Sequence, residues 1–298
     1  MTTSTAPDPT PFPARLLLAT DLSARCDRAL DRAAQLAGQW QAGLLVGHVL
    51  DPAAHPDQAL AWAAGTGAGD ALRIARQQLA RDLAGLPVQA DMQIAKSKDV
   101  AAGIRDMADA AGADLVVTGV ARFELLGRFL LGSSVERLAR SLPQPLLVVR
   151  NRPHGPYREI VVACDFSPAS RDALRCAARL FPGQELTVFH AYQQPYSGMA
   201  DTAPPARGIP QAEQDACAAF LADSKLPAST RVRPVILRGA LELLLTQHVR
   251  RHEADLVVMG AQGRGALASA LLGSTAARLL DCLPCDALVV HRPRAAAD

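Results

Sequence analysis

Short apolar runs alternate with segments of helical periodicity along the chain. In its second half, five runs are nearly continuous in Val, Leu and Ile, which is typical of strands covered on both faces: Ile160–Cys164, Leu186–Ala191, Val232–Leu237, Asp255–Met259 and Ala287–His291. Four segments between them carry apolar positions three and four residues apart and predict amphipathic helices: Ser170–Leu180, Gln211–Ala222, Ala240–Arg251 and Ser274–Asp281. Strands separated by such helices predict right-handed crossovers and a parallel, doubly wound sheet.

The same pattern occurs in both halves of the chain. Leu16–Leu36 aligns with Ile160–Leu180, which places Asp21 on Asp165, and farther on His48 aligns with His190. An internal repeat of this length predicts two copies of one domain. We therefore expect an α/β protein of two tandem Rossmann-like domains, each a five-stranded parallel doubly wound sheet with helices on both faces. The predicted boundaries are a flexible N-terminus (1–13), a first domain (14–150), a proline-rich linker (151–158) and a second domain (159–293).

Composition narrows the class of protein. The chain has 298 residues and a net charge of +2, so no strong field indicates a nucleic-acid or membrane partner. It contains no apolar run long enough for a membrane helix and no signal-peptide pattern at its N-terminus. Six cysteines are too few for a disulfide scaffold of this size. A cytoplasmic protein is the expectation.

Ligands of doubly wound sheets bind beyond the carboxyl ends of the strands. The first strand of each half ends in an aspartate that precedes a helix, Asp21 and Asp165. Each aspartate is equally well explained as a helix N-cap or as an acceptor for a polar ligand. Ser23 or Ser167 could provide the cap while the aspartate binds.

The fourth strand of the second half leads into a glycine-rich loop, GAQGRGALASALLGST, at positions 260–275. Gly260, Gly263, Gly265 and Gly273 let backbone amides approach a ligand, and Ser274 and Thr275 open a predicted helix. Amides at a helix start form an anion site that suits a phosphate chain. The alternative is a tight turn followed by a helix cap.

The loop spacing is specific: G-x-x-G, nine residues, then G-[ST] is met by Gly260, Gly263, Gly273 and Ser274. Together with Asp165 after the first strand and His190 at the end of the second, it resembles the ATP-binding branch of the universal stress protein family. The resemblance covers nearly the whole chain, with one family domain in each half.

The resemblance implies a role for each matching residue. Asp165 would receive the adenine or ribose edge, with Ala163 and Cys164 beside it, and Ala191 would contact the base through its backbone. The ribose and phosphates of ATP would lie on Gly260, Gly263, Gly265, Gly273, Ser274 and Thr275. Arg264 would reach a phosphate or remain solvated. Mg²⁺ or Mn²⁺ would be held through the phosphates and not by protein side chains, and His190 would pack behind the site.

The first half keeps most of this pattern in a possible degenerate site: Asp21, Val49, Gly119, Gly132, Ser133 and Ser134. It places Arg122 at the position of Gly263. A long side chain there would fill the site, which predicts that the first half binds ATP poorly. Alternatively, the guanidinium of Arg122 would neutralise phosphate charge and binding would persist in altered form.

The expected function is ATP binding by a cytoplasmic stress-response protein that acts as a nucleotide-dependent regulator with at most slow hydrolysis. A true ATPase or phosphotransferase and a nucleotide-free interaction module remain alternatives. The last strands, Leu146–Arg150 and Ala287–His291, are expected to pair within one chain as an internal pseudo-dimer; a homodimer and an unidentified protein partner are also possible. Residues 193–211 read as a mobile cover or as disorder, and Cys282-Leu-Pro-Cys285 as a redox motif only by its spacing.

Overall fold

The computed structural model describes residues 12–51, 68–120, 124–125, 128–129, 133–193, 208–263 and 272–291. The chain forms two compact units. Unit 1 comprises Met1–Val120 and Arg152–Pro156, and unit 2 comprises Ala121–Asn151 and Tyr157–Asp298. The last helix and strand of the first sequence repeat therefore belong to unit 2.

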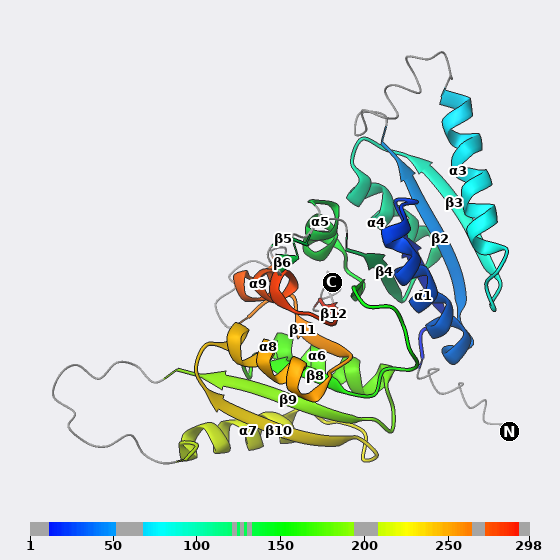
Figure 1. Ribbon diagram of the computed structural model, residues 1–298. Coiled ribbons are helices and arrows are strands. Elements are labelled where there is room, and N and C mark those ends of the chain that lie inside the picture. The colour runs from blue at the N-terminus through cyan, green and yellow to red at the C-terminus, as the bar shows by residue number, and fades with distance from the viewer. Residues whose placement is uncertain are drawn as a thin grey trace, which may run out of the picture. The chain divides into compact units, whose positions relative to one another are not determined.

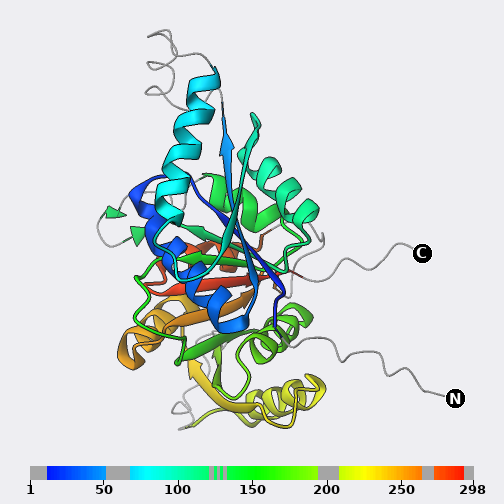
Figure 2. The ribbon, with the colours of Figure 1, turned by 90° about the vertical axis from the view of Figure 1, so that its right-hand side faces the viewer.

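Unit 1 contains four parallel strands in the order β4-β1-β2-β3. Its strands are β1 (Arg15–Ala19), β2 (Gly43–Leu50), β3 (Ala90–Lys96) and β4 (Leu115–Gly119). Its helices are η1 (Ala24–Cys26, a 3₁₀ turn), α1 (Asp27–Trp40), α3 (Ala68–Leu83) and α4 (Val100–Ala111). Figure 2 shows α1 and α3 on one side of these strands and α4 on the other. This arrangement is a doubly wound sheet.

Unit 2 has the strand order β10-β9-β8-β11-β12-β7. Its strands are β7 (Leu146–Val149), β8 (Ile160–Cys164), β9 (Glu185–Tyr192), β10 (Arg231–Arg238), β11 (Leu256–Gly260) and β12 (Asp286–Val290). Its helices are α5 (Ser133–Ser141), α6 (Pro168–Leu180), α7 (Gln211–Asp223), α8 (Leu241–His252) and α9 (Ser274–Cys282). In Figure 1, α7 and α8 flank β9 and β10 from opposite sides.

The predicted α/β fold is confirmed. Each strand and helix predicted in the second half is present, with ends within two residues of the expected ones. A two-stranded ladder in the glycine loop of the first repeat was not expected: β5 (Glu124–Leu125) pairs antiparallel with β6 (Arg128–Phe129). Among the helices of the described ranges, none has both the length and the apolar character that a membrane crossing requires.

The predicted pairing of the two last strands is also confirmed, since β12 lies antiparallel to β7 with Leu288 opposite Leu147. The buried carboxylate of Asp286 holds the chain that leaves β7. Its Oδ1 accepts from the backbone N–H groups of Arg150 (2.8 Å) and Asn151 (3.0 Å), and its Oδ2 accepts from the Tyr157 hydroxyl (2.6 Å). Several hydrogen bonds to one buried carboxylate offset the cost of its desolvation.

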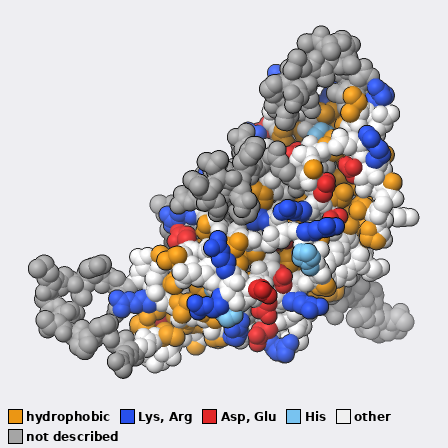
Figure 3. Space-filling model, in the orientation of Figure 1, with side chains coloured by type: hydrophobic (Ala, Val, Ile, Leu, Met, Phe, Trp, Pro, Cys, Tyr) orange, Lys and Arg blue, Asp and Glu red, His pale blue; other side chains and the backbone are white. Residues whose placement is uncertain are grey.

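On the face of the molecule shown in Figure 3, basic and acidic side chains are interspersed. This mixture agrees with the small net charge of the chain, +2. No large surface of a single sign is visible on this face, so its charge favours no polyanionic partner.

Candidate functional site

The turn after β8 holds Asp165 in a defined orientation. Its Oδ1 accepts from the Ser170 hydroxyl (2.6 Å) and from the backbone N–H of Ser167 (3.0 Å). The Asp165 N–H donates to the Ser170 hydroxyl oxygen (3.1 Å). The carboxylate is half-buried and stands at the carboxyl end of the central strand, where doubly wound sheets bind ligands.

The cap of α6 comes from Ser167 and not from the aspartate. The Ser167 hydroxyl accepts from the N–H of Ser170 (3.2 Å), as an N-cap does. Phe166 lies between Asp165 and Ser167, and its φ of 61° is in the left-handed region. The N-cap position of α6 is therefore held by Ser167, and Asp165 contacts the first turn of the helix through the Ser170 hydroxyl.

The start of the glycine loop lies against this carboxylate. A Cβ at Gly263 would sit 3.1 Å from Oδ2 of Asp165, so any larger residue would press on the carboxylate. A Cβ at Gly273 would lie 3.6 Å from the backbone N of Gly263, and the Gly273 N–H donates to the carbonyl of Ala261 (2.7 Å). Gly263 and Gly273, ten positions apart in the motif, are thus brought close together, with Gly263 beside Asp165.

Gly260 serves packing more than ligand approach. A Cβ there would lie 2.9 Å from the backbone of Ala169, in the first turn of α6. Only glycine lets the end of β11 pass so close to that helix.

Helix α9 begins at the closed loop. Gly273 occupies its N-cap position without a side-chain cap, and Ser274 and Thr275, both exposed, form its first turn. The first amides of a helix lack intrahelical acceptors and favour an anion. Arg264 and Gly265, also predicted for this site, lie outside the described residues.

His190 packs behind the turn, as expected. Its Nδ1 lies 2.8 Å from the carbonyl oxygen of Cys164 and its Nε2 3.2 Å from Oε2 of Glu213 on α7. The Phe166 ring stacks on it at 4.1 Å between centroids. Ala163 and Cys164 are buried in β8, and Ala191, predicted to contact the base, is half-buried in β9.

The first repeat has the same turn. Oδ1 of Asp21 accepts from the N–H (2.9 Å) and hydroxyl (2.6 Å) of Ser23 and lies 3.1 Å from the Cys26 thiol, which occupies the place of Ser170. Val49 and Gly119 are buried in unit 1. Ser133 and Ser134 begin α5 in unit 2, whereas Arg122 and Gly132 lie outside the described residues.

Two buried cysteines of the second repeat, Cys164 and Cys285, are not poised for redox chemistry. Burial raises the pKa of the Cys285 thiol to about 12, with a smaller contribution from Asp286. Burial likewise raises the pKa of Cys164 to about 12. Because the thiolate is the reactive form, these two thiols are held in their less reactive, protonated state.

Three residues of the site were missed from the sequence: Phe166, Ser170 and Glu213. Ser170 had a usable signal in the sequence. A hydroxyl three residues after an N-cap serine can bond to that serine and to the aspartate before it. Glu213 had none, because its contact with His190 depends on how α7 packs against β9.

Known proteins resemble this chain in sequence over both repeats. The sequence model of the universal stress protein family matches residues 14–150 and 156–291. A universal stress protein of Mycolicibacterium smegmatis is 28% identical over 302 residues, covering 94% of this chain and 97% of its own. Universal stress protein MJ0531 of Methanocaldococcus jannaschii is 27% identical over 148 residues, covering 46% of this chain and 84% of its own.

Solved structures show the same fold over both repeats. A universal stress protein from Archaeoglobus fulgidus superposes with a TM-score of 0.64 at 18% identity, covering 94% of this chain and 98% of that one. A functionally unknown protein, PA1789 from Pseudomonas aeruginosa, gives 0.63 at 20% identity, covering 95% and 94%. With the family match over both repeats, these findings establish that the chain belongs to the universal stress protein family.

Proposed function

We propose that the protein binds ATP, mainly through the second repeat, and acts as a nucleotide-dependent regulator in the cytoplasm. The observation that carries this proposal is the convergence of the glycine loop on Asp165. A Cβ at Gly263 would lie 3.1 Å from Oδ2 of Asp165, closer than most side-chain carbons approach a neighbour. A cradle that a single Cβ would fill suits close backbone approach to a ligand.

The residues fit a nucleotide in two parts. Asp165, oriented by Ser167 and Ser170, would accept hydrogen bonds from the hydroxyl or amino groups of the nucleoside. The closed loop at Gly263 and Gly273, with the first amides of α9 and the hydroxyls of Ser274 and Thr275, would hold the phosphates. Arg264 and Gly265 would extend the phosphate side, and Ala191 would contact the base.

A divalent cation, Mg²⁺ or Mn²⁺, would be held by the phosphates. In the part of the chain that the structure describes, no three His, Cys, Asp or Glu side chains gather as metal ligands do. When bound, the cation would supply charge neutralisation on the phosphate oxygens. If Asp165 binds the nucleoside, it is not available to activate a water molecule. Hydrolysis of ATP would therefore be slow.

The first repeat would bind ATP poorly. Its Asp21 turn is built like the Asp165 turn, but Arg122 takes the place of Gly263. In the second repeat that position faces the aspartate at 3.1 Å from Oδ2. An arginine at the same place would press its Cβ on the carboxylate, and its guanidinium would pair with that carboxylate in place of a nucleoside.

The test is calorimetric titration of ATP with Mg²⁺ into the wild type, Gly263→Arg and Arg122→Gly. We expect about one ATP per chain in the wild type and loss of binding, by at least about a hundredfold, in Gly263→Arg, because the side chain would fill the space beside Asp165 and a hundredfold corresponds to about 2.8 kcal/mol. Arg122→Gly makes the same exchange in reverse: it should add ATP binding in the first repeat if Arg122 blocks that site, and it leaves the second repeat unchanged.

Two equal sites in the wild type would contradict the asymmetry between the repeats. Retention of wild-type affinity in Gly263→Arg would contradict the assignment of the loop. Steady turnover that is lost in Gly263→Arg would favour an ATPase or phosphotransferase, and no ATP binding at all would favour an interaction module.

A further inference from the structure

The Ser170 hydroxyl is buried beneath the Asp165 turn and uses its full hydrogen-bonding capacity there. It donates to Oδ1 of Asp165 at 2.6 Å and accepts from the backbone N–H of the same residue at 3.1 Å. Oγ of Ser167 lies 3.3 Å away, and because the Ser170 hydrogen is already used, Ser167 is the donor in this contact. A hydroxyl offers one hydrogen and two lone pairs, so all three are engaged. Ser170 is 4% exposed, which limits the competition of water for these bonds.

The oxygen of the Ser167 hydroxyl is used by the helix. It accepts from the N–H of Ser170 at 3.2 Å, and α6 is α-helical from Pro168 onward. The two serines of this turn therefore have separate roles: Ser170 holds the aspartate side chain, and Ser167 caps the helix.

The first repeat has a similar backbone at this point but divides the roles differently. Ser23, the counterpart of Ser167, is extended with φ of −85° and ψ of 153°, against −78° and 164°. Its hydroxyl donates to Oδ1 of Asp21 at 2.6 Å and makes no cap bond to the helix. The chain continues as the 3₁₀ turn η1, and α1 begins only at Asp27. The same serine position thus serves the helix in one repeat and the aspartate in the other.

The residue that differs beneath the two turns is Cys26, the counterpart of Ser170. Its thiol sulfur lies 3.1 Å from Oδ1 of Asp21. Burial, with a smaller contribution from Asp21, raises the pKa of this thiol to about 12, so it keeps its hydrogen. A thiol is a weak donor and a weak acceptor. It satisfies the carboxylate less well than a hydroxyl does, and the Ser23 hydroxyl bonds to the aspartate in place of the helix.

The two arrangements restrain the aspartate to different extents. In the second repeat the hydroxyl donor is buried, Asp165 is half-buried, and its Oδ2 is the oxygen that a Cβ at Gly263 would approach. In the first repeat Asp21 is exposed and its donor Ser23 is half-buried, so water competes for the bond. A carboxylate that is fixed before a ligand arrives loses less conformational freedom on binding.

We propose that Ser170 is a positioning residue for the nucleotide site of the second repeat: its hydroxyl fixes the Asp165 carboxylate beside the glycine loop and leaves Ser167 to cap α6. Cys26 prevents this division of roles in the first repeat, which adds to the effect of Arg122 on that site. The effect on binding rests on the proposed nucleotide site, whereas the division of roles between the two serines does not depend on it.

The first experiment needs no nucleotide and compares crystal structures of Cys26→Ser and Ser170→Cys in the full chain. In Cys26→Ser we expect Oγ of Ser23 to move from the aspartate to the N–H of residue 26, and α1 to begin at Ala24. In Ser170→Cys we expect the reverse, with Oγ of Ser167 leaving the N–H of residue 170 for the aspartate. If either variant kept the serine partners of the wild type, the proposal would be overturned.

Ala24→Pro is the control for a second difference between the repeats. Helix α6 has Pro168 at its first position, and proline there favours a helix start. The Ser23 hydroxyl should stay on Asp21 in this variant, because the thiol is still beneath the turn. A capped α1 in Ala24→Pro would show that the proline, and not the residue beneath the turn, decides the division of roles.

The second experiment is calorimetric titration of ATP with Mg²⁺. Ser170→Cys should weaken binding about tenfold, the lower end of what a hydrogen bond to a charged group contributes. Ser167→Ala also removes the cap but keeps the bond from Ser170 to Asp165, so it should weaken binding by no more than about threefold. Equal losses in the two variants would mean that Ser170 acts only through the stability of α6, and would overturn its positioning role.

The two experiments separate the failure of this inference from the failure of the proposed function. Absence of ATP binding in the wild type would overturn the nucleotide site and, with it, the effect of Ser170 on binding. The crystal structures would still decide the division of roles between Ser167 and Ser170.

Discussion

The turns after β1 and β8 share a left-handed residue and an aspartate that accepts from the backbone N–H two residues later, but they differ in packing. Leu22 and Phe166, one residue after the aspartate, both have φ of 61°. The N–H of each points to the side chain two residues earlier, Thr20 Oγ1 (3.0 Å) or Cys164 Sγ (3.4 Å). A left-handed non-glycine residue at the same place in both repeats indicates that the hydrogen bonds of the turn outweigh its local strain.

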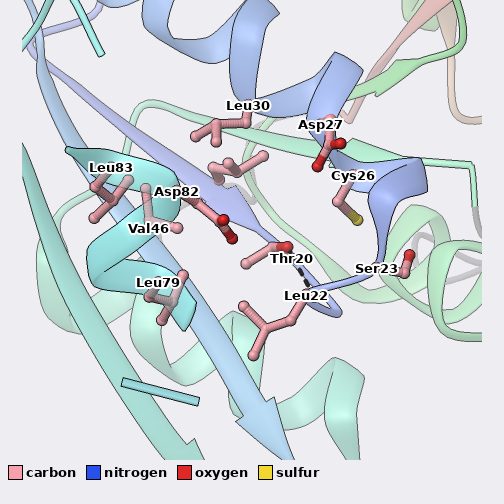
Figure 4. A pocket seen from close by; sticks show the side chains of 11 residues that line it. Thr20, Leu22, Ser23, Cys26, Asp27, Leu30, Val46, Leu79, Asp82 and Leu83 are labelled. Carbon is pink, nitrogen blue, oxygen red and sulfur yellow. Dashed lines mark hydrogen bonds between the residues drawn. The ribbon is translucent and has the colours of Figure 1, made fainter. Parts of the chain in front are cut away.

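The space beside the two turns is filled differently. In unit 2 the rings of Phe166 and Phe220 meet at 5.6 Å, and Arg171 pairs with Asp223 at 3.4 Å. In unit 1 the corresponding residues are Leu22, Leu79, Asp27 and Asp82, and they line a small pocket between α1, α3 and the sheet. Figure 4 shows the leucine side chains around this pocket, with Asp27 reaching it from α1 and Asp82 from α3.

The comparison shows that both repeats keep the aspartate of the turn and its bond to the N–H two residues later, whereas the packing around the turn has diverged. The repeats can therefore be made more alike by exchanging single corresponding residues. We expect four such exchanges to have measurable effects on stability.

The largest effect is expected for His248→Met. It places in α8 the residue that occupies the corresponding position of α4, Met107. Burial, followed by His252 and nearby arginines, lowers the pKa of His248 from 6.5 to about 4. The folded state thus keeps this ring neutral while the unfolded chain takes up a proton, so stability present above pH 6.5 is lost as the pH falls towards 4. The wild type should lose about 2 kcal/mol more than the variant between pH 7 and 4.5.

Urea unfolding at the two pH values measures that difference. The reverse exchange, Met107→His, is the control, since Met107 is also buried and a histidine there should introduce acid sensitivity into unit 1. The same pH dependence in the wild type and His248→Met would show that the ring does not titrate as its surroundings indicate.

The next largest effect is expected for Phe220→Leu. This substitution would open in unit 2 a space like the pocket beside Leu79 in unit 1. Phe220 is 3% exposed and contacts both Phe166 and Arg171. Loss of the ring should reduce the free energy of unfolding by about 1–2 kcal/mol through lost burial and a residual cavity. A change below a few tenths of a kcal/mol in urea unfolding would mean that α7 closes over the gap.

The complementary exchange, Leu79→Phe, should fill the pocket of unit 1. Cavity filling commonly adds about 0.5–2 kcal/mol, and we expect about 1 kcal/mol here. Ile74→Phe on the same helix is the matched control, because Ile74 is 48% exposed and makes no comparable space available. A decrease in the unfolding midpoint of Leu79→Phe would show that the pocket is too narrow for the ring that unit 2 accommodates.

Sequence predicted the strands well because strands buried on both faces, such as β8 and β11, are nearly continuous in apolar residues. It also predicted the aspartates and the glycine loop, since their order along the chain repeats. The left-handed conformation of Phe166 was not predictable, because nothing in its residue type favours it. The contact of Glu213 with His190 and the pocket beside Leu79 depend on how helices pack across a sheet. Local periodicity carries no information on such contacts.

The smallest effect concerns the ends of α4 and α8. Each helix ends in a left-handed residue, Gly112 with φ of 60° and Glu253 with φ of 50°. Glycine adopts this conformation without strain, whereas glutamate does not. Glu253→Gly should therefore stabilise unit 2, by only about 0.5 kcal/mol because glycine also gains entropy in the unfolded chain. Gly112→Glu should destabilise unit 1 by a similar amount, because the strain of a left-handed glutamate is only partly offset by the lower entropy of the unfolded chain. If both exchanges changed the urea midpoint in the same direction, the two helix ends would not be equivalent, and the correspondence between α4 and α8 would stop short of their C-termini.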